Sequence, residues 1–246
     1  MRILLNGFCG RMGAAVLEVA ANGYMESEVV AGVDIAPKAS DVPCYASFSD
    51  VKEKADCIID FSNHASIKAV ADYAVVSGLP LVVSTTGHTE EEKEIIRKAA
   101  QSVPVFYSAN MSMGVALLCR MATLAAKTLP GADIEIVETH HNRKLDAPSG
   151  TALMIANAIK SVRENAKFIF GRQGMAKRES DEIAVHAVRR GNIVGIHEVL
   201  VSTDYETITI KHEAHSRTLF AEGAIAAADF IIGKPAGLYD MSSIIE

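Results

Sequence analysis

The chain has no tryptophan, few other aromatic residues and few cysteines. Aromatic residues make up 6% of its 246 positions, and only four are cysteine. No two cysteines have C-x-x-C spacing, and each lies in or beside an apolar run, as is typical of reduced thiols in a cytosolic protein. We therefore expect neither a disulfide framework nor a metal site from Cys9, Cys44, Cys57 and Cys119.

Long apolar runs and an excess of positive charge are also missing. No apolar segment reaches the roughly 18 uninterrupted residues of a membrane-spanning helix, and the N-terminal MRILLNGFCG has no signal-peptide pattern. The formal net charge of −6 argues against general binding to nucleic acids. The 49% hydrophobic content is ample for a buried core. We expect a globular cytoplasmic protein that binds neither membranes nor nucleic acid.

The first part of the chain alternates short apolar runs with amphipathic helices, which is typical of a parallel sheet covered on both faces. Strands are expected at RILLN, EVVAGVD, DCIIDFS, LPLVVST and VPVFYSA. Between the last two, HTEEEKEIIRKAAQS predicts a helix with a capping box formed by Thr89 and Glu92.

The pattern changes after Asn110. A long apolar helix is expected over MGVALLCRMATLAAKTLPG, and four segments then alternate apolar and polar residues like strands with one solvated or ligand-facing side: ADIEIVETH, EIAVHAVRR, GNIVGIHEVLVS and YETITIKHEA. A final helix, capped by Ser216 and ended near Gly233, is apolar enough to pack back on the first domain. We predict an α/β domain over residues 1–111 plus 217–246, and an α+β domain over residues 112–216.

A glycine-rich turn follows the first strand. Gly7, Gly10 and Gly13 in NGFCGRMGAAV would permit a tight strand-to-helix turn whose N–H groups approach a pyrophosphate. Asp34 ends the second strand, where a carboxylate can accept hydrogen bonds from a ribose. The alternative is a plain glycine-rich connection with a surface aspartate. The order of strand, turn, helix and acid favours dinucleotide binding.

Two further strand ends carry small polar residues, in VVSTTGHT and FYSANMSMG. Ligands of open parallel sheets lie beyond the carboxyl ends of the strands. We expect Ser84, Thr85, Thr86 and the segment 108–111 to line the nicotinamide end of the site. Taken singly, each segment is more often an ordinary helix-capping loop.

The segment VETHHNRKLDAPSGTAL concentrates titratable and anion-binding groups. His140 and His141 point to opposite faces of a strand unless the strand ends between them, so one is expected to be catalytic and the other to bind or support. A helix starting near Ser149 offers free N–H groups to a carboxylate, and Lys144 adds a charge that can donate a proton. A solvated basic loop followed by an ordinary helix cap is the alternative. The adjacency of the two favours a site for an anionic substrate.

Seven segments together resemble the dihydrodipicolinate reductase family over essentially the whole chain. They are GFCGRMG, DFS, STTG, ANMSMG, HHNRKLDAPSGTA, RRGNIVGIHEV and HSRTLFAEGA. The resemblance implies a Rossmann-like dinucleotide-binding domain and an α+β substrate-binding and oligomerisation domain. It also implies reduction of 4-hydroxy-tetrahydrodipicolinate with NADH or NADPH in lysine and diaminopimelate biosynthesis, by a homotetramer acting on a cyclic dicarboxylate.

The resemblance also implies roles for individual residues. His140 corresponds to the catalytic proton donor or acceptor, and Lys144 to a second proton donor. Substrate-binding positions are His141, Ser149, Gly150 and Thr151. Cofactor-binding positions are Gly7, Phe8, Cys9, Gly10, Arg11, Met12, Asp34, Ser84, Thr85, Thr86, Ser108, Ala109, Asn110 and Met111.

One departure from the family concerns the choice of cofactor. The family often has an arginine for a 2′-phosphate directly after the acidic residue, where this chain has Ile35, and only Lys38 follows nearby. We therefore expect NADH to serve at least as well as NADPH. Two other readings stay open at this point: a different two-domain nicotinamide oxidoreductase, or a dinucleotide-sensing module without catalysis.

Overall fold

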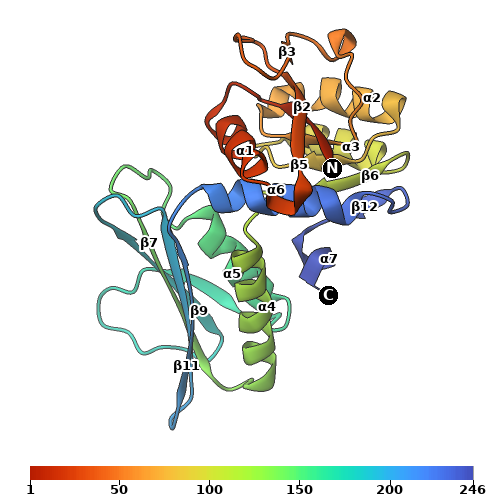
Figure 1. The fold of residues 1–246 in the computed structure, drawn as a ribbon. Coiled ribbons are helices and arrows are strands. Elements are labelled where there is room, and N and C mark those ends of the chain that lie inside the picture. Colours follow the sequence, from red (N-terminus) through yellow and green to blue (C-terminus); the bar gives the residue numbers. More distant parts are fainter. Residues whose placement is uncertain (246) are drawn as a thin grey trace. The chain divides into compact units, whose positions relative to one another are not determined.

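The protein is described by a computed structural model covering residues 1–245. The chain forms two compact units (Figure 1). Unit 1 consists of Met1–Ser112 and the segment from Arg217 on, and unit 2 is Met113–Ser216. The second unit thus starts one residue later than the predicted position 112.

Unit 1 is built on a seven-stranded sheet in which all paired strands are parallel. Its order is β12-β6-β5-β4-β1-β2-β3, the doubly wound order with β12 added at one edge. The strands are β1 (Arg2–Asn6), β2 (Glu28–Val33), β3 (Cys44–Tyr45), β4 (Cys57–Asp60), β5 (Leu81–Val83), β6 (Pro104–Tyr107) and β12 (Gly237–Tyr239). The predicted Rossmann-like α/β fold is confirmed.

Helices cover both faces of this sheet. They are α1 (Arg11–Ala21), α2 (Ile67–Ser77), α3 (Glu90–Ala99) and α6 (Thr218–Ile231). The unit also contains α7 (Met241–Ile245), which contacts α6, and single 3₁₀ turns at Tyr24–Glu26, Phe48–Asp50 and His64–Ser66. On one face, Leu4 and Ile58 pack with α2 and α3. On the other, the Phe106 ring contacts the ring of Phe230 in α6. The alternation of strand side chains thus supplies two apolar layers.

The predicted helix ends are partly right. Thr89 and Glu92 form the expected capping box of α3, and Ser149 caps α5 (Gly150–Lys160) by accepting the N–H of Ala152. The last helix begins at Thr218, so its N-cap position is one residue later than the predicted Ser216. Arg217 occupies that place with helical φ and ψ and makes no side-chain cap, because the chain has already turned into the helix there.

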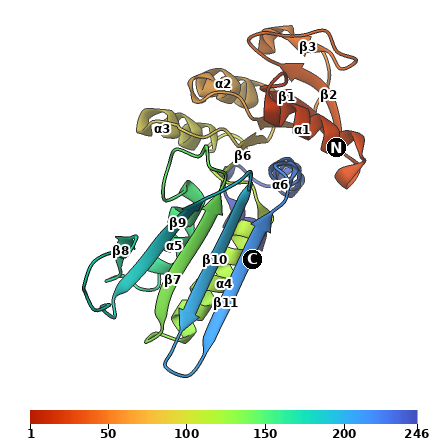
Figure 2. The same ribbon diagram turned by 90° about the vertical axis from the view of Figure 1, so that its left-hand side faces the viewer.

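Unit 2 is a mixed five-stranded sheet with two helices on one face (Figure 2). The order is β11-β10-β7-β9-β8; β9 runs parallel to β7 and β8, and the other pairs are antiparallel. The strands are β7 (Asp133–His140), β8 (Lys167–Phe170), β9 (Glu182–Arg189), β10 (Gly195–Ser202) and β11 (Thr207–Ala214), and the helices are α4 (Met113–Thr128) and α5.

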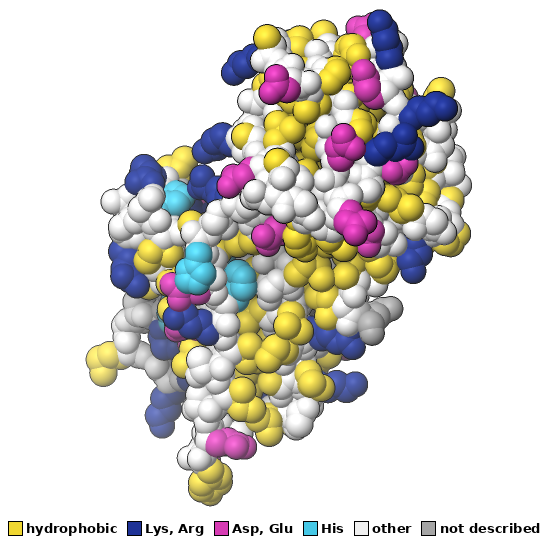
Figure 3. Space-filling model, viewed as in Figure 1, with side chains coloured by type: hydrophobic (Ala, Val, Ile, Leu, Met, Phe, Trp, Pro, Cys, Tyr) yellow, Lys and Arg dark blue, Asp and Glu magenta, His cyan; other side chains and the backbone are white. Residues whose placement is uncertain are grey.

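The core of unit 2 lies between the sheet and its helices. Ile134 and Ile136 of β7 are fully buried against Ala122 of α4 and Ile155 of α5. The other side of α4 stays apolar but exposed, with Leu117, Met121 and Leu124 at helical spacing. Apolar side chains also gather on the face of the molecule drawn in Figure 3. Unit 2 therefore keeps apolar surface after it folds.

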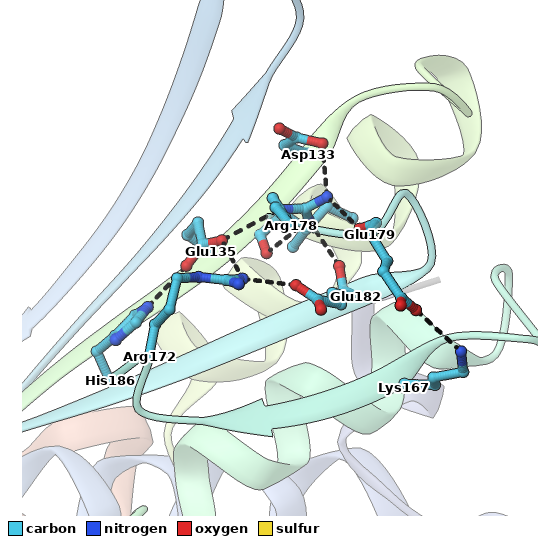
Figure 4. A network of polar contacts seen from close by, with 9 residues as sticks. Asp133, Glu135, Lys167, Arg172, Arg178, Glu179, Glu182 and His186 are labelled. Atoms are coloured by element: carbon cyan, nitrogen blue, oxygen red, sulfur yellow. Dashed lines mark hydrogen bonds and ion pairs between the residues drawn. The ribbon is translucent and has the colours of Figure 1, made fainter. Parts of the chain in front are cut away.

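An arginine network holds the connection between β8 and β9 (Figure 4). Arg178 pairs with Asp133 at 2.6 Å and with Glu135 at 3.3 Å, and it donates to the main-chain oxygen of Glu182 at 2.7 Å. Since Arg178 lies in the connection and its partners lie on β7 and β9, these contacts fasten the connection to the sheet.

Within residues 1–245, no helix is long and apolar enough to cross a membrane.

Close packing at one glycine of α6 gives a prediction for stability. A Cβ on Gly223 would lie 1.7 Å from the main-chain oxygen of Met111. Gly223→Ala should therefore force backbone movement and lower the free energy of unfolding by about 1–3 kcal/mol. Urea denaturation of the purified variant measures this. Gly131→Ala, whose added Cβ would meet nothing within 4 Å, is the matched control and should stay within about 0.5 kcal/mol of wild type. Equal unfolding free energies for both variants would contradict the packing argument.

Candidate functional site

Glu138 is a fully buried carboxylate near the end of β7. Its Oε2 accepts a hydrogen bond from Nδ1 of His140 at 2.6 Å, and its Oε1 accepts the main-chain N–H of Ser149 at 3.0 Å. Arg189 donates to both oxygens, at 2.8 and 2.7 Å. Burial alone would raise the pKa of Glu138, but these donors outweigh it and hold the pKa at about 2. Glu138 is therefore an anion that joins β7, β9 and the start of α5.

His140 ends β7 with its ring held in one orientation. Because the Glu138 carboxylate can only accept, Nδ1 of His140 carries the donated hydrogen, and Nε2 is left for other contacts. The backbone of Gly195 passes close to this second nitrogen: a Cβ there would lie 3.1 Å from Nε2. A buried base with a fixed tautomer can take up or give a proton at Nε2.

His197 of β10 packs beside His140. The two rings meet edge to face at 5.2 Å between centroids, and Nε2 of His197 lies 3.4 Å from Oγ of Ser149. Burial, and then the charge of His140, lower the pKa of His197 to about 4. His197 is therefore neutral at neutral pH, and it supports the site without adding charge.

The loop after β7 places the remaining predicted residues. His141 lies beyond the strand end, and its N–H donates to the main-chain oxygen of Ile193 at 2.8 Å, so the strand does end between the two histidines. Nζ of Lys144 lies 2.9 Å from Oδ1 of Asp146. Gly150 and Thr151 form the first turn of α5. One strand, one loop and one helix start thus gather every residue that we predicted for chemistry and substrate.

Four residues of this site were missed by the sequence analysis: Glu138, Asp146, Arg189 and His197. Glu138 carried a signal, because it lies two residues before His140 and so points to the same side of a strand. His197 lies directly opposite Glu138 in the β7–β10 register, and Arg189 lies opposite His140 in the β7–β9 register. Those two proximities depend on strand pairing, which the sequence did not supply.

The glycine turn of unit 1 is as tight as predicted. Gly7 has φ +81°, and a Cβ on it would lie 2.3 Å from the main-chain oxygen of Phe61. A Cβ on Gly13 would lie 2.4 Å from the oxygens of Gly7 and Phe8. Gly10 is the N-cap of α1 and has no side-chain cap. Glycine is therefore required for the turn, and backbone lies where a phosphate can approach it.

Asp34 lies beside this turn. Its Oδ2 accepts the N–H of Cys9 at 2.9 Å, and its Oδ1 accepts the N–H of Ala36 at 3.0 Å. The following side chain, Ile35, is 99% exposed and offers no polar group. The carboxylate is thus held next to the glycine turn by backbone donors.

A cavity of about 470 Å³ opens at the carboxyl ends of the unit 1 strands. Its lining includes most of the predicted nicotinamide segments and adds Phe61, Ser62, Arg217 and Phe220. The lining residues are Arg11, Met12, Phe61, Ser62, Ser84, Thr85, Thr86, Ala109, Asn110, Met111, Arg217 and Phe220. The segment DFS after β4 could have revealed Phe61 and Ser62, whereas nothing in the sequence placed α6 at this cavity.

Two predicted cofactor residues have other contacts. The Phe8 side chain is buried and lies over Gly32, where a Cβ would come within 2.1 Å of the ring. Oγ of Ser108 donates to the main-chain oxygen of Asn110 at 2.7 Å, and Ser108 is not among the residues that line the cavity. The Phe8 side chain thus packs against β2, and the Ser108 side chain bonds within its own loop.

A buried acid lies beneath the cavity. Asp60 accepts from Nδ2 of Asn6 at 2.7 Å and from the Ser62 hydroxyl, and burial raises its pKa. Its second oxygen and the buried hydroxyl of Ser84 have no hydrogen-bond partner among residues 1–245. Unpartnered polar groups next to a cavity suit a polar ligand or bound water.

Within residues 1–245, no three His, Cys, Asp or Glu side chains gather to hold a metal ion.

Sequence profiles identify the family of the chain. The profile of the dihydrodipicolinate reductase N-terminus matches residues 1–111, and that of the dihydrodipicolinate reductase C-terminus matches residues 114–245. The two matches together span nearly the whole protein.

Individual relatives agree with the profiles. The 4-hydroxy-tetrahydrodipicolinate reductase of Caldanaerobacter subterraneus subsp. tengcongensis is 46% identical, over 100% of this chain and 98% of that protein. The enzyme of the same name from Clostridium tetani is 40% identical, over 100% and 97%. A dipicolinate-bound dihydrodipicolinate reductase from Paenisporosarcina sp. TG-14 has the same fold, with a TM-score of 0.83 at 24% identity over 100% of this chain and 99% of that one. The chain belongs to the dihydrodipicolinate reductase family.

Proposed function

We propose that this protein reduces 4-hydroxy-tetrahydrodipicolinate, also called dihydrodipicolinate, to tetrahydrodipicolinate with NADH or NADPH, in lysine and diaminopimelate biosynthesis. Full-length identity of up to 46% to reductases of that name supports the assignment. The main structural support is His140, which the buried Glu138 carboxylate orients, with Lys144 and the start of α5 in the same segment.

The residues of unit 1 fit a nicotinamide dinucleotide. The glycine turn leaves space that any Cβ would fill, and the helix start behind it favours an anionic pyrophosphate. Asp34 can accept hydrogen bonds from ribose hydroxyls, and the segments at Ser84–Thr86 and Ala109–Met111 would line the nicotinamide end. When bound, the cofactor supplies a hydride. The protein itself has to bind, orient and protonate the substrate.

The residues of unit 2 fit the protonation step and a dicarboxylate. Nε2 of His140 would give a proton to the substrate atom that becomes electron-rich, while Glu138 stabilises the charged imidazole. Lys144 would act as a second proton donor. His141, Ser149 and the first N–H groups of α5, at Gly150 and Thr151, would hold a substrate carboxylate.

The acid–base roles give the central test of the proposal. His140→Ala and Lys144→Ala should each lower kcat by about 100-fold or more, because each removes a positioned proton donor, while NADH binding stays nearly unchanged. Loss of NADH absorbance with substrate made in situ by the upstream synthase measures kcat, and NADH titration measures binding.

The same assay separates the alternatives. A wild-type protein that binds NADH but turns over none of the cyclic dicarboxylate would be a sensing module or a different oxidoreductase. If both variants keep near-native kcat and only raise KM, His140 and Lys144 are binding residues and the catalytic assignment is wrong. Arg143→Ala is a matched control in the same loop, where Arg143 donates to Asn192.

The choice of cofactor can be predicted from Asp34 and its neighbours. The Asp34 carboxylate suits a ribose 2′-hydroxyl and repels a 2′-phosphate, and Ile35 cannot offset that repulsion. We expect kcat/KM with NADH to be at least equal to that with NADPH, and the remaining NADPH activity to depend on Lys38 and to weaken with salt. Measuring both ratios in wild type, Lys38→Ala and the control Lys98→Ala tests this. A clear preference for NADPH that survives Lys38→Ala would overturn it.

We also propose a cytoplasmic homotetramer assembled through unit 2. The family resemblance supports it, and so does the sheet face that α4 and α5 leave uncovered within the described residues (Figure 2). That face mixes charges with apolar side chains such as Val137 and Val188, the latter 39% exposed.

Sedimentation equilibrium should give four times the 26.3 kDa chain mass. Val188→Lys should reduce this mass, whereas Val76→Lys on α2 should not. A monomeric wild type would refute the assembly.

A further inference from the structure

Asp146 lies where the proposed function puts a substrate carboxylate. Its Oδ1 is 2.9 Å from Nζ of Lys144, and the main-chain N–H of Gly150, at the start of α5, also lowers the pKa of this carboxylate. Lys144 is proposed above as a proton donor to the substrate, and the N–H of Gly150 as a donor to a substrate carboxylate. The protein's own carboxylate therefore uses the same cation and the same helix start that would bind the ligand.

The Asp146 main chain is fixed while its side chain is free to leave. The main-chain oxygen accepts a hydrogen bond from Nη2 of Arg189 at 2.7 Å, and Arg189 is itself held by the buried Glu138. The Asp146 side chain, in contrast, is 57% exposed, whereas that of Lys144 is only 22% exposed. Rotation of the aspartate side chain would return it to water without disturbing Glu138 or Arg189.

From this geometry we infer that Asp146 is an internal competitor for the substrate's carboxylate. In the free enzyme it occupies the anion position made by Lys144 and Gly150, and a bound dicarboxylate takes its place. Binding then exchanges one carboxylate for another at the same donors. Because the exchange cancels part of the attraction, Asp146 lowers the affinity for every anion. The loss of affinity is smallest for a dicarboxylate, because its second carboxylate binds at other donors.

The lowered pKa of Asp146 agrees with this assignment. Burial would raise it, but the hydrogen bond and charge of Lys144, with the N–H of Gly150, lower it. A bound dicarboxylate that displaces the side chain removes those contacts, so the Asp146 pKa should rise towards its ordinary value. The carboxyl ¹³C resonance of Asp146, followed against pH with and without ligand, reports this change directly.

The inference rests on the proposed substrate site, and binding of pyridine-2,6-dicarboxylate tests it without turnover. Asp146→Asn keeps the shape but removes the competing charge, so it should tighten binding of this dianion by about threefold to tenfold, as expected for a partly exposed ion pair. It should also make the enzyme more sensitive to inhibition by inorganic sulfate. Asp181→Asn, which breaks a comparable ion pair with Lys167, is the matched control and should leave binding unchanged.

A double-mutant cycle removes the main competing explanation, that Asp146 only orients Lys144. Competition requires the cation, so Asp146→Asn should tighten binding in wild type and lose most of that effect in Lys144→Ala. Unchanged or weaker binding in Asp146→Asn, together with a lower kcat, would show an orienting role and overturn the inference. If wild type itself fails to bind pyridine-2,6-dicarboxylate, the proposed substrate site is wrong instead, so the two failures are distinguishable.

Discussion

The candidate site of unit 2 depends on keeping one negative charge buried. A carboxylate without contact to water is costly unless donors surround it, and Glu138 receives them from His140, Arg189 and the Ser149 backbone. Those donors lie on β7, on β9 and at the start of α5. The requirement to satisfy a single anion therefore fixes the histidine ring, the strand end and the helix start in one arrangement.

The same anion connects the chemistry to the control of binding. Arg189 neutralises Glu138 and also holds the Asp146 main chain at 2.7 Å. Loss of Arg189 would thus disturb the orientation of His140 and the loop that carries Lys144 together. The site behaves as one unit, so the effects of substitutions at these positions should not add.

The sequence predicted which segments form the candidate site better than the contacts that hold those segments together. Local order was sufficient for the glycine turn and for the strand, loop and helix around His140, because the residues of each are neighbours along the chain. Asp34 followed from the succession of strand, turn, helix and strand. Arg189 and His197 reach the site only through the registers of β9 and β10 with β7. Likewise β12 has three residues, too few for a periodic pattern, and it joins the sheet of unit 1 only by pairing with β6.

The placement of α6 has a consequence for how the protein is made. This helix is buried along Ala221, Ala224, Ile225 and Ala228 against the sheet of unit 1, yet it is encoded after the whole of unit 2. During synthesis, residues 1–112 leave the ribosome without the helix and edge strand that complete them, and a sheet face stays open until about a hundred further residues have been added. Unit 2 is continuous in sequence, so all of its strands have been synthesised before α6 is made. The dinucleotide-binding unit is thus begun first and finished last.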